Sequence, residues 1–152
     1  MFQIVSNSPE ETIAFAKKFA AYLRAGDVVA FTGTLGAGKT HFTKGIASAL
    51  GFSGDVYSPT FAIVNEYRST PPIYHFDMYR ISGFESLYST GFFDFLDGNS
   101  VIVIEWSENI SEFLPENTIF VDISSDLEST DKRTITVKGD GRFDDLRNRL
   151  SR

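Results

Sequence analysis

The sequence predicts an α/β fold in which a mostly parallel central sheet is flanked by helices in three layers. Apolar, β-favouring runs at 28–31 and 101–105 are typical of strands buried on both faces, as the strands of a parallel sheet are. Segments with helical spacing of apolar residues alternate with such strands, which is the order that builds this kind of sheet. With 152 residues, 42% of them apolar and 22% charged, the chain 1–152 is expected to form one domain around a single core.

The N-terminal part of the chain predicts a strand followed by a helix. Residues 2–5 favour a short strand, and the helix is expected to run from Ser8 to about Leu23. Its start combines a capping serine, a proline in the first turn and Glu11 three positions after the cap. The sequence therefore predicts two strands and one helix before residue 33.

The segment 33–40 reads Gly-Thr-Leu-Gly-Ala-Gly-Lys-Thr, which is a complete G-x-x-x-x-G-K-T pattern. It follows the strand at 28–31 and precedes a segment with helical spacing of apolar residues that ends at Gly51. Strand, loop and helix thus come in the order that a phosphate-binding P-loop requires. A chance glycine-rich turn is the alternative, and this context argues against it.

Each residue type in this loop suits a triphosphate. Gly33, Gly36 and Gly38 allow a tight turn whose backbone N–H groups point at one place. The positive end of the following helix adds to the attraction for an anion. Lys39 is expected to reach the outer phosphates as a point charge, and the Thr40 hydroxyl is expected to hold a bridging Mg²⁺.

Two strand-end carboxylates are candidate partners for that ion. Glu105 ends the strand at 101–105, and Asp77 ends a second candidate strand at 73–77. Ligands bind at the carboxyl ends of parallel strands, and Mg²⁺ on a P-loop needs an oxygen ligand from a neighbouring strand. We therefore favour Glu105 for the metal or its water and Asp77 for a supporting or catalytic role. A solvated or helix-capping carboxylate is the other interpretation of each.

The remaining pattern predicts alternating strands and helices. Runs at 61–67 and 72–77, joined by the turn-rich 68–71, are a candidate hairpin. The other expected elements are a short helix at 84–90, the strand at 101–105, a helix at 107–113, strands at 118–123 and 134–137, a polar loop at 124–132, and a final helix at 143–150. The side chains of Phe92, Phe93 and Phe95 are expected in the core.

Three further residues lie near these motifs, and two of them have more than one interpretation. Thr60, in Ser58-Pro59-Thr60, lies where a P-loop protein carries a switch segment and offers a hydroxyl to Mg²⁺, although Ser-Pro also starts simple turns. His75 is expected to pack within its strand. Trp106, directly after Glu105, is a core residue, an aromatic wall of the site or an anchor for a partner.

Composition excludes several classes of protein. Twenty acidic and 14 basic residues give a formal charge of −6, which disfavours a broad surface for nucleic acid. The absence of cysteine excludes disulfides and zinc-thiolate sites, and His41 and His75 cannot form a metal site alone. No apolar run approaches the roughly eighteen residues that span a bilayer, and residues 1–8 do not resemble a secretory signal. We therefore expect a cytoplasmic protein that does not associate with a membrane.

Taken in order, these motifs resemble the TsaE family, the bacterial ATPases of tRNA threonylcarbamoyladenosine biosynthesis. The resemblance covers nearly the whole chain and rests on Gly33 to Thr40, Ser58-Pro59-Thr60-Phe61, Tyr74-His75-Phe76-Asp77-Met78-Tyr79-Arg80, Gly91 with Asp94, Ile104-Glu105-Trp106 and Leu114-Pro115. It implies ATP binding with Mg²⁺, slow hydrolysis and service as an accessory subunit to a complex with TsaD and TsaB type proteins. That complex forms N6-threonylcarbamoyladenosine at position 37 of tRNAs that read A-starting codons, so tRNA would be contacted only indirectly, through the partners.

The resemblance also implies roles for individual residues. Lys39 and the loop amides of Gly33, Leu35, Gly36, Ala37 and Gly38 would bind phosphates. Thr40 and Glu105 would manage Mg²⁺, with Thr60 as a switch ligand and Asp77 and Glu105 as catalytic groups. Ser8, Thr12 and Arg133 would lie near the nucleoside, and His41, where such proteins often have Thr or Ser, would be a peripheral contact.

Other classes of nucleotide-binding protein are considered on their own motifs. A signalling GTPase needs an N-K-x-D motif and a D-x-x-G switch, and the chain has neither. A small-molecule kinase would use the same loop with an arginine-bearing lid, for which the stretches around Arg68 and Arg80 are the only candidates. A third hypothesis is a binding module in which the bound nucleotide sets the affinity for a partner and hydrolysis is incidental.

Overall fold

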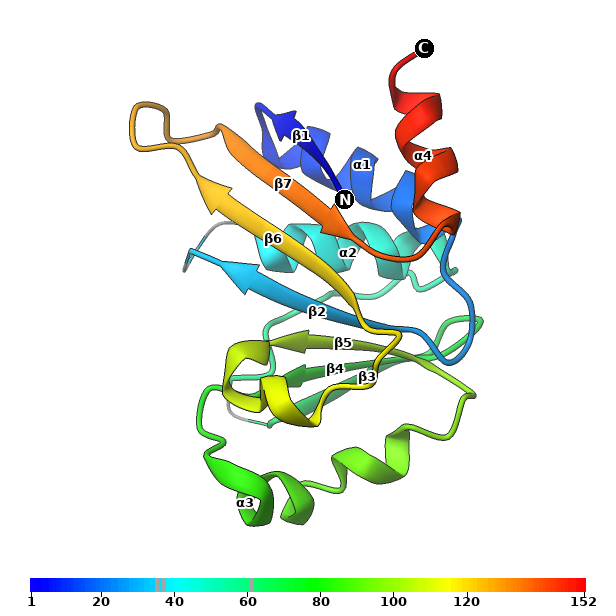
Figure 1. Ribbon diagram of the computed structural model, residues 1–152, viewed down its shortest axis with the longest axis vertical. Coiled ribbons are helices and arrows are strands. Elements are labelled where there is room, and N and C mark those ends of the chain that lie inside the picture. Colours follow the sequence, from blue (N-terminus) through cyan, green and yellow to red (C-terminus); the bar gives the residue numbers. More distant parts are fainter. Residues whose placement is uncertain (35, 37, 61) are drawn as a thin grey trace.

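The computed structural model describes residues 1–34, 36, 38–60 and 62–152, which form a seven-stranded sheet with helices on both faces (Figure 1). The strand order across the sheet is β1-β7-β6-β2-β5-β4-β3. The strands are β1 (Phe2–Ser6), β2 (Val28–Gly33), β3 (Val64–Tyr67), β4 (Ile73–Asp77), β5 (Val101–Glu105), β6 (Ile119–Ser125) and β7 (Arg133–Lys138). The helices are α1 (Pro9–Ala20), α2 (Lys39–Ala49), α3 (Gly83–Ser89) and α4 (Arg142–Leu150), with 3₁₀ helices η1 (Phe92–Phe95) and η2 (Ser107–Phe113).

The sheet is mixed, so the prediction of a mostly parallel sheet is only partly right. The central strands β6, β2, β5 and β4 are parallel to one another, whereas β1 with β7, β7 with β6, and β3 with β4 pair antiparallel. The short connections explain two of these antiparallel pairs. Residues 126–132 and 68–72 are too few for the crossover that parallel neighbours need, so each forms the loop of a hairpin. The hairpin expected around 68–71 is thereby confirmed.

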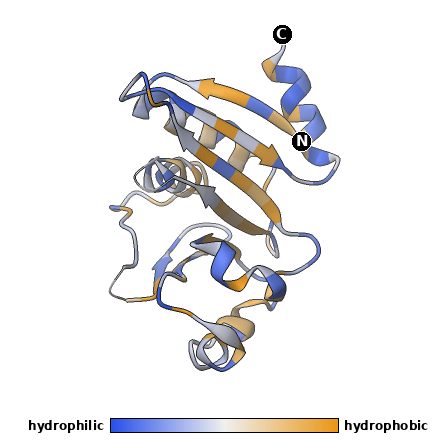
Figure 2. Cartoon of the chain, turned by 60° about the vertical axis from the view of Figure 1, so that its left-hand side comes forward, coloured by the Kyte–Doolittle hydropathy of each residue, from blue (hydrophilic) through white to orange (hydrophobic). Residues whose placement is uncertain are grey.

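The apolar core consists of two clusters, one on each face of the sheet, rather than the single core expected from chain length. Helices α1, α2 and α4 cover one face, where Phe19, Phe42 and Phe143 pack on the strands. The other cluster, around Phe76 and Phe92, lies between β2, β5, β4 and the elements α3, η1 and η2. Figure 2 shows the sheet strands largely in the apolar colour and α4 mainly in the hydrophilic one. The parallel strands β2, β5 and β4 are therefore buried on both faces along most of their length.

Several element boundaries differ from the sequence-based expectation. Helix α1 ends at Ala20 rather than near Leu23, because the chain tightens into i to i−3 hydrogen bonds at residues 22 and 23. The segment 107–113 is a 3₁₀ helix, and η1 was not expected. Of the phenylalanines at η1, Phe92 is fully buried, while those at 93 and 95 are partly buried against the second cluster.

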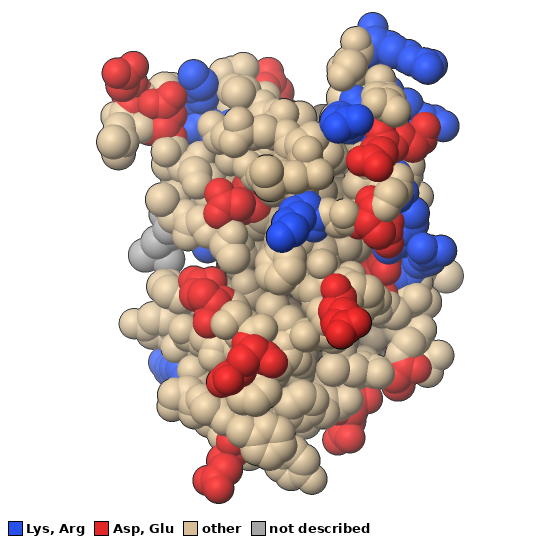
Figure 3. All heavy atoms as spheres, viewed as in Figure 1, with Lys and Arg blue, Asp and Glu red and all other residues tan. Residues whose placement is uncertain are grey.

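One face of the sheet is left without a helix over β1, β7 and β6. Along β6 and β7, side chains on the α1 side are buried and those on the opposite side are half-buried or exposed. Figure 3 views the molecule from that side and shows acidic groups over its lower half, with no continuous basic stripe. No helix of the described residues is long and apolar enough to cross a membrane.

Candidate functional site

The predicted site residues meet at the carboxyl edge of the parallel strands. The P-loop segment follows β2, and the acidic residues Asp77 and Glu105 end β4 and β5. Because β2, β5 and β4 are parallel neighbours, their carboxyl ends lie at the same edge. Asp77 and Glu105 are directly opposite each other in the β4–β5 register. The fold therefore brings the loop and both carboxylates to one place.

Gly33 allows the loop to leave the sheet in close contact with β6. Its φ of +113° belongs to the left-handed region, and an added Cβ would overlap the carbonyl oxygen of Ile123. Next along the loop, the Thr34 amide donates to that carbonyl at 3.2 Å, and the Ser125 amide donates to the Thr34 hydroxyl at 3.0 Å. The first residue of the motif is thus a glycine for steric reasons that are independent of phosphate.

The end of the loop presents the N-terminus of α2 without a capping side chain. Gly38, the residue before the helix, has a φ of +103°, and Gly36 has a φ of +72° with open space around it. The first turn of α2 contains no acidic residue. Its first N–H groups and the positive end of its dipole are therefore available to an anion. Leu35 and Ala37, also predicted to offer loop amides, lie outside the described residues.

Lys39 and Thr40 open α2 at the mouth of this loop. The Lys39 ammonium donates to the Gly33 carbonyl at 3.3 Å, across the loop, and lies 6.0 Å from the centre of the Trp106 ring. The half-buried Thr40 side chain makes no hydrogen bond to the part of the chain that the structure describes. His41 is exposed on the same turn. A cation and an uncommitted hydroxyl therefore lie next to the helix N-terminus.

Asp77 and Glu105 are nearly buried and face the layer that contains α2. They are 8% and 9% exposed, and they lie on the same strand faces as Ile73 and Val103, which belong to the apolar cluster under α1 and α2. The Asp77 carboxylate accepts from the Tyr79 amide at 2.9 Å. Among the described residues, neither carboxylate has a Lys or Arg partner. Two adjacent acids without a cation form a favourable place for a divalent metal ion.

The described residues do not gather three His, Asp or Glu side chains that could hold a metal ion by themselves. Mg²⁺ characteristically binds through one or two carboxylates together with waters and substrate phosphates, so the pair at 77 and 105 suits that ion when a nucleotide supplies the other oxygens.

A hydrogen-bonded histidine beside Glu105 was not found by sequence analysis. His75 is completely buried, as expected, but it also contacts two polar groups. Its Nε2 is 2.7 Å from Oε2 of Glu105, and its Nδ1 is 2.9 Å from the Tyr67 hydroxyl. That hydroxyl is also 3.0 Å from the Tyr57 carbonyl oxygen. The signal was present in the sequence, because these side chains alternate onto the same face of β3, β4 and β5 at diagonal positions.

Thr60 lies in a compact turn next to the strands. Its hydroxyl is 3.2 Å from that of Ser58, and the Pro59 carbonyl accepts from the amides of Ala62 and Ile63 at 3.2 and 3.0 Å. The side chain of Thr60 is exposed, and its described contacts stay within this turn. The structure therefore does not join Thr60 to Thr40 or Glu105, and its role as a switch ligand stays a prediction.

The residues predicted near the nucleoside have structural contacts at the same edge of the sheet. Ser8 caps α1 by accepting from the Glu11 amide at 3.1 Å. Thr12 is 2% exposed, and its hydroxyl is 2.7 Å from that of Ser6. Arg133 starts β7 opposite Ser6 and donates to the Thr130 carbonyl at 2.8 Å. The hydroxyls of Ser8 and Thr12 thus stabilise the start of α1, and a nucleoside contact of any of the three stays a prediction.

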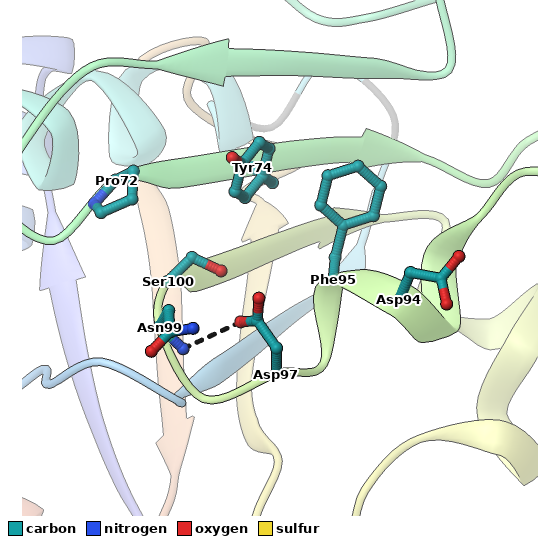
Figure 4. A pocket seen from close by; sticks show the side chains of 7 residues that line it. All are labelled: Pro72, Tyr74, Asp94, Phe95, Asp97, Asn99 and Ser100. Carbon is teal, nitrogen blue, oxygen red and sulfur yellow. Dashed lines mark hydrogen bonds between the residues drawn. The ribbon is translucent and has the colours of Figure 1, made fainter.

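A cavity at the opposite edge of the sheet does not suit a phosphate. Figure 4 shows this cavity of about 230 Å³, with Tyr74 and Phe95 as aromatic walls and the carboxylates of Asp94 and Asp97 beside them. Ser100, at the start of β5, contributes a buried hydroxyl with no hydrogen-bond partner among the described residues. Because β5 has five residues, this end lies roughly 15 Å from the P-loop edge. Two carboxylates would repel a polyphosphate, so we place the candidate site at the P-loop edge.

The fold and the site together define the class of protein. It is an α/β protein with a P-loop at the carboxyl edge of its parallel strands and two acidic residues on neighbouring strands.

Comparison with known proteins identifies the family. The family model described as "Threonylcarbamoyl adenosine biosynthesis protein TsaE" matches residues 6–135. The tRNA threonylcarbamoyladenosine biosynthesis protein TsaE of Bacillus subtilis (strain 168) is 40% identical over 146 residues, which are 95% of this chain and 90% of its own length. The protein of the same name from Rickettsia prowazekii (strain Madrid E) is 45% identical over 120 residues, covering 77% and 82% of the two chains. The chain therefore belongs to the TsaE family.

A solved structure agrees with this assignment. The crystal structure of Bacillus subtilis YdiB matches with a TM-score of 0.77 at 36% sequence identity, covering 99% of this chain and 93% of the other. The two chains therefore share the same fold over nearly their whole lengths.

Proposed function

We propose that this protein is a Mg²⁺-dependent ATP-binding protein with slow ATPase activity that is required, as an accessory subunit, for formation of N6-threonylcarbamoyladenosine in tRNA. One observation carries the nucleotide part of the proposal. An uncapped helix N-terminus with Lys39 and Thr40 lies at the same sheet edge as Asp77 and Glu105, two nearly buried acids that have no Lys or Arg partner among the residues that the structure describes. The relatives named for threonylcarbamoyladenosine biosynthesis support the pathway.

The residues of the site divide the work between binding and orientation. The α2 N-terminus and Lys39 attract the phosphates, because both place positive charge at the mouth of the P-loop. The Thr40 hydroxyl and the Glu105 carboxylate are the groups that would hold Mg²⁺, which, when bound, neutralises charge on the phosphate oxygens. Asp77, beside Glu105, is the group we assign to accepting a proton from the attacking water or to orienting it.

We expect slow hydrolysis because the candidate arginines do not contact the described residues of the P-loop. Arg68 and Arg80, the nearest candidates in the sequence, are both exposed, and none of their side chains makes a described contact with the P-loop. An arginine that stabilises transition-state charge contributes about 10³-fold or more in other P-loop enzymes. We therefore expect partner proteins, of the TsaD and TsaB type, to be needed for full function, and tRNA to be contacted through them.

Substitution of Lys39 tests nucleotide binding directly. Lys39→Ala is expected to weaken ATP binding by about 100-fold or more, because it removes the charge that lies across the loop. Lys44→Ala is the matched control, since Lys44 is exposed on the same helix but outside the motif. Calorimetric titration with ATP measures both variants, and thermal unfolding shows that they fold. Equal ATP affinity of Lys39→Ala and wild type would refute the assignment of the loop.

The accessory role is tested in cells and in extract. In a bacterium that lacks its own TsaE, the wild-type chain is expected to restore threonylcarbamoyladenosine in tRNA, and Lys39→Ala is expected not to. Capture of TsaD and TsaB type proteins from extract, compared with ATP and with ADP, identifies the partners. Formation of ADP and of a phosphorylated acceptor when small-molecule acceptors are added, with no partner present, would instead favour a kinase.

A further inference from the structure

The Glu105 carboxylate is held by a buried chain of side chains that ends on the backbone of a loop. His75 and Tyr67 form this chain, which we name the Tyr67–His75 relay, and its last contact is the Tyr57 carbonyl. We propose that His75 and Tyr67 are positioning residues that orient the Glu105 carboxylate for Mg²⁺. This inference rests on the proposed function, because it assumes that Glu105 meets the ion.

Burial leaves the relay little freedom to move. His75 is completely buried and Tyr67 is 3% exposed. The Tyr67 ring packs against Phe52, with 5.0 Å between ring centres, and against the imidazole at 5.9 Å. Side chains enclosed in this way stay in one rotamer, so they can fix the position of a group to which they donate a hydrogen bond.

Donor and acceptor roles determine the direction of the relay. An ionised carboxylate only accepts, so a neutral His75 places its single N–H on Nε2, toward Glu105. Nδ1 then carries a lone pair and accepts from the Tyr67 hydroxyl. Burial raises the pKa of Tyr67 above its ordinary value, so the hydroxyl keeps the proton that it donates.

The same hydroxyl connects the site to the segment that carries Thr60. It has one proton and two acceptors in reach, Nδ1 of His75 at 2.9 Å and the Tyr57 carbonyl at 3.0 Å. The Tyr57 carbonyl also accepts from the Asn65 amide at 3.2 Å, so it keeps a partner when Tyr67 donates to the imidazole. Tyr57 directly precedes Ser58, so the end of the relay lies beside the start of the predicted switch segment, although the Tyr67 proton is used by His75.

In the tautomer that we propose, with one proton on Nε2, the imidazole orients Glu105 without cancelling its charge. The hydrogen bond engages one carboxylate oxygen, Oε2, and leaves the other oxygen for a further ligand. Groups that orient a metal-binding side chain in this way typically change metal affinity or activity by about 10 to 100-fold when removed. A neutral donor leaves the negative charge of the Glu105 carboxylate available to a cation. An arginine or lysine at position 75 would neutralise that charge.

Removal of one hydroxyl tests the relay with little change in packing. Tyr67→Phe keeps the ring and deletes the donor to His75, and Tyr22→Phe is the matched control, since the Tyr22 hydroxyl donates to Asp145 at 2.6 Å near α4. Affinity for a non-hydrolysable ATP analogue is measured by calorimetry with Mg²⁺ and with EDTA. Tyr67→Phe is expected to weaken binding about 10-fold with Mg²⁺ and to leave it unchanged in EDTA. Tyr22→Phe is expected to match wild type in both.

Substitutions of His75 separate positioning from packing. His75→Gln retains an N–H donor of similar reach, whereas His75→Leu retains only bulk. We expect His75→Gln to keep most of the Mg²⁺-dependent gain in affinity and His75→Leu to lose it. Equal loss in both variants, or a loss in Tyr67→Phe that is as large in EDTA as in Mg²⁺, would overturn the proposal in favour of a purely structural role.

Nitrogen NMR tests the relay without any nucleotide. The chain has only two histidines, so the ring signals of His75 are readily distinguished from those of the exposed His41. The wild type is expected to show His75 with its proton on Nε2, and Tyr67→Phe is expected to show a mixture of both tautomers. A wild-type proton on Nδ1 would overturn the relay even if ATP binds. Failure of wild type to bind Mg²⁺-ATP, with the Nε2 tautomer present, would instead refute the proposed function.

Discussion

Two buried carboxylates lie at opposite ends of neighbouring strands, and their surroundings differ. Asp27 immediately precedes β2 and is 3% exposed, and Glu105 ends β5 and is 9% exposed. The Asp27 carboxylate accepts from the Arg24 amide at 2.8 Å and from two nitrogens of Arg142, each at 3.0 Å. Within the part of the chain that the structure describes, the Glu105 carboxylate has the His75 imidazole as its one hydrogen-bond partner, at 2.7 Å.

The difference shows how burial of an acid can serve either stability or function. A buried carboxylate loses hydration, and a bidentate arginine replaces it while cancelling the charge. The Asp27 carboxylate therefore has its hydrogen bonds and its charge satisfied, and its ion pair with Arg142 connects α4 to the start of β2. Glu105 accepts a hydrogen bond from His75 but has no Lys or Arg partner among the described residues, which is the arrangement that the proposed Mg²⁺ site requires. By this reasoning the first carboxylate belongs to the fold and the second to the site.

The largest expected effect is that of substituting Glu105, the acid without a Lys or Arg partner in the described part of the chain, on the rate of hydrolysis. Glu105→Gln keeps the size of the side chain and removes its charge, so we expect Mg²⁺-dependent hydrolysis, measured by phosphate release, to fall by about 100-fold or more. Thermal stability is expected to stay equal or to rise, because a buried charge without a cation is removed. A large fall in melting temperature with unchanged turnover would reverse the assignment of the two carboxylates.

The next largest effect is expected on stability, when Asp27 loses its arginine partner. Arg142→Leu leaves Asp27 buried without its cation, so we expect the free energy of unfolding to fall by about 3 kcal/mol, measured by urea unfolding. For a chain of this length that corresponds to a melting temperature lower by roughly 6 to 12 °C. ATP affinity is expected to be unchanged, because Asp27 and Glu105 lie at opposite edges of the sheet.

Two variants sharpen this test. Arg149→Gln is the control on the same helix, since the Arg149–Asp145 ion pair is exposed and its loss is expected to have no measurable effect. Asp27→Asn combined with Arg142→Leu is expected to be more stable than Arg142→Leu alone, because no unpaired charge remains. A double variant as unstable as the single one would show that Arg142 acts by packing on Phe143, 5.4 Å from its guanidinium, rather than by charge.

Local patterns in the sequence predicted the elements that position the site, and they did so for physical reasons. The run 101–105 is uniformly apolar until its final acid, and it forms a strand with all five residues buried. The P-loop pattern constrains the backbone, and at Gly33 the structure shows why only glycine fits. Such features depend on neighbours in the chain, so the chain alone reveals them.

The features that sequence analysis did not predict depend on pairing between strands that are distant in the chain. The position of β1 at the sheet edge follows from contacts between residues more than a hundred positions apart, such as Ile4 with Ile135. The contact of His75 with Glu105 likewise depends on which strands are neighbours and in what register. Tyr67 and Arg142 were unremarked for the same reason, since neither has a local motif. Sequence analysis identified the ends of the strands but not the side chains that support them.

The smallest expected effect is a pH dependence in the arginine cluster. Hydrogen bonds from Arg142 hold the pKa of the half-exposed Asp140 below its ordinary value. A carboxylate with a lowered pKa stabilises the folded state above its ordinary pKa, near 4, and loses that contribution as the pH falls through the lower, folded value. Because Asp140 is exposed, we expect Asp140→Asn to cost only about 0.5 kcal/mol at pH 7. In urea unfolding, this difference from wild type is expected to shrink toward zero as the pH falls below 4.

The same small effect reports on Arg142. In the Arg142→Leu background the Asp140 carboxylate loses the guanidinium but keeps the hydrogen bond from the backbone amide of residue 142, so the pH-dependent part of the Asp140→Asn effect is expected to become smaller without vanishing. A pH-dependent difference as large as that in the wild-type background would assign the shift to this amide and to Arg24, whose charge also lowers the pKa of Asp140. The guanidinium of Arg142 would then act on the buried Asp27 rather than on Asp140, whereas Glu105 has no such cation among the described residues.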